Sequence, residues 1–175
     1  VTMIAGELDL SVGSVAALAG IGAVTLLPLG LLPAVGLTVA GAAAFGAFQG
    51  FIIAVLRINS LVLTIGTMFA VRGLAHVMSG GAAVQVPVAD LDLADALIAR
   101  IGVFSPFSLV TLVVLAVCGV LLVASRWGRE LLAVGGGREE SAAAGVPQRR
   151  PVVLAFTSSA ATAALAGSLA SLASG

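Results

Sequence analysis

The sequence has little charge, no lysine, no tyrosine and a single cysteine. Of its 175 residues, 9% are charged, and eight basic side chains, all of them arginine, balance eight acidic ones. Nucleic-acid-binding domains carry a basic excess and disulfide scaffolds are rich in cysteine, so both classes are excluded. Hydrophobic residues make up 60% of the chain, which excludes intrinsic disorder. Because about a quarter of the residues in soluble domains are charged, this composition indicates a membrane-embedded protein.

Long apolar stretches take the place of the missing charge. A membrane-spanning helix needs about 20 apolar residues, and five stretches approach this length: residues 12–32, 34–56, 61–78, 107–124 and 152–172. They predict an all-α fold, a polytopic transmembrane helix bundle with about five spans in one transmembrane domain over residues 1–175. The chain starts at Val1 and stops at Gly175 beside an apolar stretch, so we expect an internal fragment with sequence missing on both sides.

The connections between the spans differ in charge. Arg57 lies in a short turn where Asn59 or Ser60 is able to cap the next helix. Five arginines and three glutamates lie in residues 126–151, whereas residues 79–106 contain Asp90, Asp92, Asp95 and Arg100. Cytoplasmic loops of membrane proteins collect basic residues. We therefore expect Arg57 and residues 126–151 on the cytoplasmic side, and residues 79–106 as a periplasmic loop.

Small residues are frequent in the second and last spans. The last span is rich in Ala and Ser, which let membrane helices approach closely, so we expect it in the bundle interior. Gly46 and Gly50 form a GxxxG pattern in the second span. That pattern is compatible with helix packing inside the chain and with specific dimerisation.

The segment directly before the first span is polar. Residues 6–14, here called the polar segment, read GELDLSVGS. Asp9 or Ser11 can serve as a simple helix N-cap, or Asp9, Ser11 and Ser14 can line a transport route as a polar break in the membrane. No second acid–base group is near in sequence, so no catalytic residue is predicted.

A second candidate is Arg72, which lies with His76 on one face of the third span. Arg72 can reach the lipid headgroups by snorkelling or form a structural ion pair, or it can be a functional charge on the substrate pathway. No metal site is expected at His76, because the chain has one His and one Cys and no carboxylate close by in sequence.

The third candidate is a short helix expected at residues 138–144. Gly137 precedes it, Gly145 and Pro147 follow it, and acidic residues favour its first turn. An isolated helix this short is marginal in water, so it must pack on lipid, on its own bundle or on a partner. The preceding three glycines are not a phosphate-binding Walker A motif, which requires a Lys. Any ATP-driven work must therefore come from a partner.

Three stretches together resemble one family, the permease subunits of bacterial ribose-type sugar ABC importers. The polar segment is similar to the family pattern G-x-x-D-L-S-V-G-S. Residues 59–68, NSLVLTIGTM, with Arg72-Gly73 and Gly80-Gly81, are similar to N-S-x-x-x-T-L-G-T-M…R-G…G-G. Gly128-Arg129 with residues 133–136 and Gly145-Val146 are similar to G-R…A-x-G-G-N…S-G-I. Gly137 departs from the family Asn, and Glu140 and Ser141 replace an Ala pair.

The resemblance implies a multi-pass permease of the bacterial inner membrane that imports a monosaccharide of the ribose, xylose or galactose type. It implies that residues 138–144 form a coupling helix that docks on the ATPase through Arg138, Glu139, Glu140, Ser141, Ala142 and Ala143. The implied partners are two ATP-binding cassette subunits, a periplasmic sugar-binding protein, a second permease copy and membrane lipid, with no nucleic acid. The permease would be non-catalytic and bind no cofactor, since ATP and Mg²⁺ would bind the partner subunit.

Other functions remain as alternatives. A branched-chain amino acid ABC permease shares this architecture, and composition does not exclude it. An ion-coupled secondary carrier requires an acidic relay inside the membrane, but the second to fifth spans contain no Asp or Glu. A purely structural membrane scaffold leaves Arg72 and the polar segment without a purpose.

Overall fold

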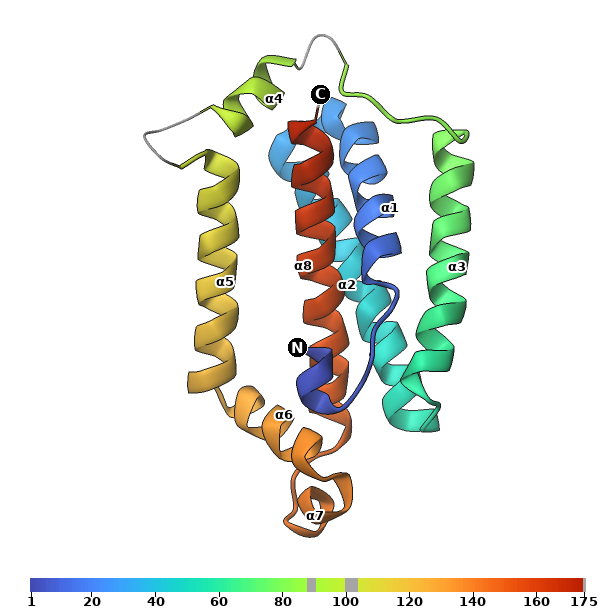
Figure 1. Ribbon diagram of the computed structural model, residues 1–175, viewed down its shortest axis with the longest axis vertical. Helices are drawn as coiled ribbons and strands as arrows, with labels where there is room; N and C mark the ends of the chain where they lie inside the picture. Colours follow the sequence, from blue (N-terminus) through green and yellow to red (C-terminus); the bar gives the residue numbers. More distant parts are fainter. Residues whose placement is uncertain (88–90, 100–103, 175) are drawn as a thin grey trace.

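The computed structural model of the chain describes residues 1–87, 91–99 and 104–174. Asp90 and Arg100, two charges of the expected periplasmic loop, lie outside the described residues. The described part is built from helices (Figure 1). Their bounds are η1 Thr2–Ala5, α1 Val12–Thr25, η2 Leu27–Leu29, α2 Leu31–Leu56, α3 Ser60–Ser79, α4 Leu91–Ile98, α5 Pro106–Ala124, α6 Arg126–Gly136, α7 Arg138–Ala143 and α8 Arg149–Ala173.

The long helices alternate in direction. The chain runs up α1, down α2, up α3, down α5 and up α8 in the view of Figure 1. The turn at Arg57 and the short helices α6 and α7 therefore lie at one end, and α4 lies at the opposite end. This is the relative arrangement expected from five alternating spans. The end that faces the cytoplasm stays a prediction.

Four helices of the described residues, namely α2, α3, α5 and α8, are long and apolar enough to cross a membrane. This confirms the predicted all-α polytopic bundle. The first span is shorter than expected, because α1 has 14 residues and measures only about 21 Å at 1.5 Å per residue. The turn after α1 contains Pro28 and ends at Gly30, whose φ of 102° favours glycine. Pro33 lies beyond this turn, in the first turn of α2, where a missing N–H breaks no helical bond.

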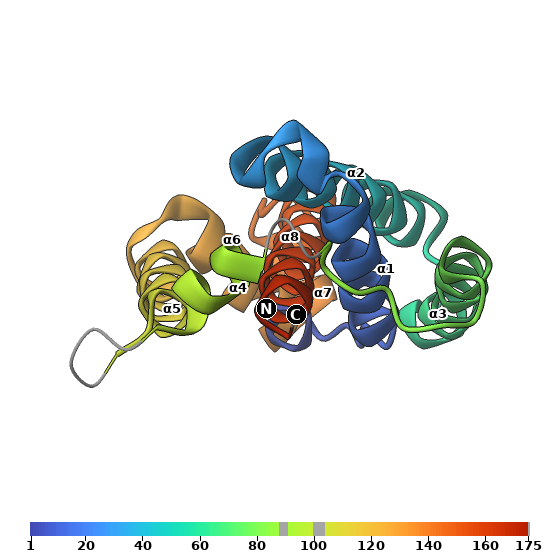
Figure 2. The same ribbon diagram turned by 90° about the horizontal axis from the view of Figure 1, so that it is seen from above.

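Helix α8 occupies the centre of the bundle, with α3 and α5 on opposite sides of it (Figure 2). Its Ala- and Ser-rich sequence contributes ten buried residues, which confirms the expected interior position. A side chain at Gly46 of α2 would overlap the Phe156 carbonyl oxygen of α8, and a Cβ at Gly50 would lie 2.8 Å from Val153 Cα. The GxxxG pattern therefore packs helices within the chain.

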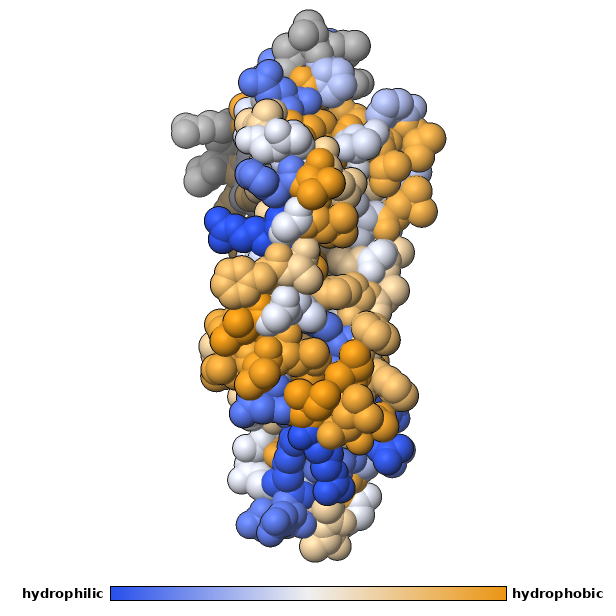
Figure 3. Space-filling model, turned by 90° about the vertical axis from the view of Figure 1, so that its right-hand side faces the viewer, coloured by the Kyte–Doolittle hydropathy of each residue, from blue (hydrophilic) through white to orange (hydrophobic). Residues whose placement is uncertain are grey.

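The outer helices expose apolar side chains. Helix α5 has no buried residue in its 19 positions, and α3 buries only Ser60, Thr64, Val71 and Ala75. Figure 3 shows the α3 side of the molecule, where an apolar band crosses the middle and hydrophilic residues gather at the lower end. Lipid or further helices must cover such surfaces, because soluble proteins do not expose apolar patches of this extent.

Two short helices were not expected from the sequence. Helix α4 lies within the expected periplasmic loop at residues 79–106, and α6 lies within the expected cytoplasmic loop at residues 126–151, ahead of the one helix expected there. Helix α6 is amphipathic: Leu131 and Val134 are buried, whereas Arg126 is exposed. The side chain of Ser125 accepts a hydrogen bond from Gly128 N at 3.1 Å, which caps the first turn. The hydropathies of its polar and apolar residues cancel over the 11 positions. A search for long apolar stretches therefore does not find this helix.

Replacing Gly46 by Val should destabilise the bundle. The new side chain must push α2 away from the α8 backbone, and overpacking of this kind typically costs about 1–3 kcal/mol. The matched control is Gly36→Val, at a position in the same helix where no atom lies within 4 Å of the added Cβ. The midpoint of thermal unfolding of the full-length protein in detergent should fall for Gly46→Val and change little for Gly36→Val. Equal midpoints would contradict the close α2–α8 packing.

Candidate functional site

The polar segment enters the bundle without helical structure. Residues 7–11 have no regular secondary structure, and α1 begins only at Val12, partway along the bundle (Figure 1). Glu7, Ser11 and Ser14 are nevertheless buried. Polar groups inside a membrane protein must find partners within the protein. Side chains of α2, α3, α7 and α8 supply partners for groups of the polar segment.

Asp9 is the centre of the resulting hydrogen-bond network. Its Oδ1 accepts hydrogen bonds from Ser11 N at 3.0 Å and from Ser11 Oγ at 2.7 Å. Its Oδ2 accepts a hydrogen bond from Ser159 Oγ of α8 at 3.0 Å. Asp9 therefore stabilises the start of α1 and also connects the polar segment to α8. Ser11 occupies the N-cap position, but its side chain makes no capping bond, so the simple N-cap interpretation describes only part of this site.

Two further connections attach the polar segment to α2 and α3. Ser11 Oγ lies 3.4 Å from Gln49 Oε1 of α2, and Gln49 Nε2 donates a hydrogen bond to Thr67 Oγ1 of α3. The backbone of Leu8 is also paired: its N–H donates to Ser60 Oγ at 3.2 Å, and its carbonyl accepts from Thr64 Oγ1 at 3.3 Å. Four parts of the chain thus share one polar cluster, in which Ser11, Gln49 and Thr64 are buried and Asp9 and Ser159 are half-buried.

The groups of this cluster are hydrogen-bond donors and acceptors. Hydroxyl, amide and carboxylate groups suit a polyhydroxy ligand or ordered water, since each can donate or accept. Among the described residues, no group of three His, Cys, Asp or Glu is placed to hold a metal ion. The cluster includes Asp9 and Ser11, two of the four residues expected on the substrate pathway, and Ser14 is buried in the first turn of α1.

The structure does not bring Arg72 to this cluster. Arg72 and His76 both lie exposed on α3, although the buried face of the same helix carries Thr64 and Val71. Within the described part of the chain, Arg72 forms neither an ion pair nor a hydrogen bond. A role for Arg72 in the pathway stays a prediction.

The expected short helix at residues 138–144 is present as α7, Arg138–Ala143. Only Ser141 is buried: its Oγ donates to Arg138 O at 3.1 Å and accepts from Gln148 Nε2 at 2.9 Å. Glu139, Glu140, Ala142 and Ala143 are exposed. A hollow of about 320 Å³ beside α7 is lined by Arg57, Arg138, Glu139, Ala142, Gln148 and Arg149, together with Ala54 and Val55. Ser141 therefore anchors α7, and the opposite face is open to a partner.

Sequence analysis missed Gln49 and Ser159 as members of the site. Gln49 had a visible signal, because it is the only amide in the 26 residues of α2 and is 1% exposed. Ser159 had none, since it is one of several serines in a helix rich in Ala and Ser. Only the packing of α8 against the polar segment distinguishes Ser159 from its neighbour Ser158, which bonds to its own helix at Ala155 O.

Comparison with known proteins assigns the chain. The family model described as branched-chain amino acid transport system / permease component matches residues 1–175. The chain belongs to this permease family. It is 35% identical to the L-arabinose transport system permease protein of Escherichia coli over 171 residues, which cover 93% of this chain and 49% of that protein.

Other relatives of this permease family bear different substrate names. The chain is 36% identical to the autoinducer 2 import system permease protein of Klebsiella pneumoniae over 123 residues, 70% of this chain and 35% of that protein. It is 29% identical to the fructose import permease protein of Bifidobacterium longum over 175 residues, 94% of this chain and 51% of that protein. The chain thus spans about half the length of the arabinose and fructose relatives. No solved structure gives a significant match.

Asp9 and Ser159 should stabilise the permease jointly. Asp9→Ala leaves the Ser159 hydroxyl and the Ser11 N–H without an acceptor, and a lost hydrogen bond to a charged group typically costs about 1.5–3 kcal/mol. Ser159→Ala should cost less, and the double variant should cost less than the sum of the two, because both remove one contact. The free energies of unfolding in detergent of the wild type, the two single variants and the double variant measure this coupling. Ser158→Ala is the control, and strictly additive losses would exclude the Asp9–Ser159 hydrogen bond.

Proposed function

We propose that the chain is part of the membrane subunit of an ATP-driven importer that moves a monosaccharide across the bacterial inner membrane. The observation that carries the proposal is the partly buried polar cluster around Asp9, held at the start of a helix of only 14 residues. Discontinuous membrane helices form substrate sites in transporters, because their ends leave hydrogen-bonding groups free near the middle of the bilayer. The names of the arabinose and fructose relatives support a sugar as cargo.

In this proposal Asp9, Ser11 and Ser14 line or border the substrate pathway. Sugars carry hydroxyl groups that donate and accept hydrogen bonds, and the carboxylate, hydroxyls and Gln49 amide of the cluster match both needs. The proposed sugars are monosaccharides of the ribose, xylose or galactose type. L-Arabinose, named for the Escherichia coli relative, is a further candidate. A periplasmic binding protein at the α4 end would deliver it.

The energy for import comes from partners in this proposal. Two ATP-binding cassette subunits, which bind ATP and Mg²⁺, dock on α7 of two permease copies, and the permease itself catalyses no reaction. The exposed face of α7 supports this role, because Glu139 and Ala143 lie on the side away from the anchoring Ser141 and Glu140 is exposed beside them. A polar surface of this kind suits a reversible interface.

A second candidate cargo is a branched-chain amino acid, which the name of the permease family indicates. The two candidates differ in what they require of the site. An amino acid presents a fixed positive and a fixed negative charge, whereas the described cluster has one carboxylate at its centre, Asp9. Competition of labelled sugar uptake by L-leucine, L-arabinose, D-ribose, D-xylose and D-galactose separates the two candidates.

The proposed orientation is tested by cysteine labelling. In a Cys118→Ala background of the full-length permease, Ala96→Cys on α4 should react with an impermeant maleimide added to intact spheroplasts, and Ala144→Cys after α7 should react only after lysis. Both alanines are exposed, so accessibility depends only on the side of the membrane. Position 141 is unsuitable because Ser141 is buried. The opposite labelling pattern would invert the topology.

The docking role of α7 is tested by Ala143→Asp. A charge on the face that meets the ATPase loses its hydration, and unpaired buried charges are strongly destabilising. The variant should insert in the membrane at normal abundance but lose co-purification of the ATPase subunit and lose sugar uptake. Ala96→Asp at the other end of the bundle should keep the ATPase. If Ala143→Asp retains both the ATPase and uptake, α7 is not the docking helix and the proposed mechanism fails.

A further inference from the structure

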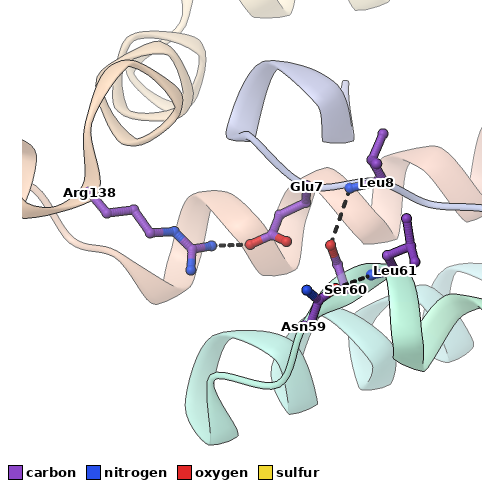
Figure 4. A network of polar contacts seen from close by, with 6 residues as sticks. All are labelled: Glu7, Leu8, Asn59, Ser60, Leu61 and Arg138. Atoms are coloured by element: carbon purple, nitrogen blue, oxygen red, sulfur yellow. Dashed lines mark hydrogen bonds and ion pairs between the residues drawn. The ribbon is translucent and has the colours of Figure 1, made fainter.

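Glu7 connects the polar segment to α7. The Glu7 carboxylate is 9% exposed and forms an ion pair with Arg138, the first residue of α7 (Figure 4). The other ion pair of the described residues, Arg126–Glu130, joins two residues of the single helix α6. The Glu7–Arg138 pair is therefore distinctive, because it joins two elements separated by 131 positions in the chain.

The chain on either side of Glu7 is held tightly. Before it, η1 packs on α6 so closely that a side chain at Gly135 would overlap the Ile4 carbonyl oxygen. After it, the Leu8 N–H is bonded to Ser60 Oγ at the start of α3 (Figure 4). Glu7 thus lies between the short helices at the α7 end of the molecule and the cluster around Asp9.

Physical reasons favour joint movement of α7 and Glu7. Separation of the pair would leave a buried carboxylate without its cation, which is strongly unfavourable. Glu7 is only two residues from Asp9, and two residues of chain reach at most about 7 Å. If Arg138 moves and Glu7 moves with it, the short connection to Asp9 must also shift. This shift changes the hydrogen bonds that Asp9 accepts from Ser11 and Ser159.

We propose that Glu7 and Arg138 are positioning residues that transmit movement of α7 to the Asp9 cluster and stay paired throughout the transport cycle. This inference rests on the proposed function, in which α7 receives that movement from the ATPase. A single ion pair then connects α7 to the Asp9 cluster, and neither Glu7 nor Arg138 needs to touch the substrate.

The first test measures how much sugar is imported per ATP hydrolysed. Glu7→Gln and Arg138→Gln remove one charge each in the full-length complex reconstituted in liposomes with its ATPase and binding protein. Glu7→Gln, which lies outside the docking helix, should keep the ATPase subunit and hydrolyse ATP, but import about tenfold less sugar per ATP, a typical size for coupling between two sites. Arg138→Gln should show the same loss of sugar per ATP in complexes that retain the ATPase. Arg126→Gln, which breaks the ion pair inside α6, is the control and should keep the normal ratio.

A covalent link provides the second test and detects a merely structural effect. In the Cys118→Ala background, the double variant Glu7→Cys/Arg138→Cys lacks the ion pair and should be uncoupled when reduced. Joining the two cysteines with a short bifunctional thiol reagent should restore the ratio of sugar to ATP, and cleaving the reagent should abolish it again. A variant damaged in folding would not recover in this reversible way.

Two outcomes overturn the inference. One is a normal ratio in Glu7→Gln and Arg138→Gln, which would make the pair a static contact. The other is loss of transport on cross-linking, which would mean that α7 and the polar segment separate during the cycle. Neither outcome resembles failure of the proposed function, which appears instead as retained ATPase binding and uptake in Ala143→Asp.

Discussion

The structure depends on one constraint: backbone and side-chain polar groups inside a membrane bundle must be bonded to other protein groups. Residues 7–11, between η1 and α1, are not helical, so their N–H and C=O groups lack the partners that a helix would supply. Ser60 and Thr64 pair the backbone of Leu8, and Ser159 pairs the carboxylate of Asp9. These partners belong to α3 and α8, both far from the polar segment in sequence. The polar segment can therefore exist only where α3 and α8 approach it.

Close helix packing makes that approach possible. Glycines at the α2–α8 contact let α8 lie almost against the α2 backbone, and the same occurs where Gly167 of α8 meets Ala16 of α1. Between lipid-exposed helices there is little hydrophobic driving force, because lipid tails are as apolar as the side chains. Small residues compensate, since they increase van der Waals contact and leave room for hydroxyls such as Ser168, which donates to Ala19 O at 3.3 Å. The tight interior and the polar cluster are thus parts of one arrangement.

The proposed import mechanism joins two distant features of this arrangement. The ATPase would act on α7 at one end, whereas the sugar would pass the Asp9 cluster inside the bundle. A short non-helical segment held at Glu7 and at Asp9 is well suited to transmit movement between them, because it has fixed attachments at both points.

Much of the fold follows from local composition, but the site does not. Runs of about 20 apolar residues must become membrane helices, so α2, α3, α5 and α8 were predictable, as were the charge contrast between their connections and the helix between Gly137 and Gly145. The motifs also identified Asp9, Ser11 and α7 as candidates. Tertiary structure alone decided that α1 starts partway along the bundle, that α6 folds as an amphipathic helix, and that Gln49, Ser159 and Glu7 join the candidates. The physical reason is range: helix formation depends on neighbours in sequence, whereas the partner of a buried polar group is whichever side chain the packed helices bring within hydrogen-bond distance.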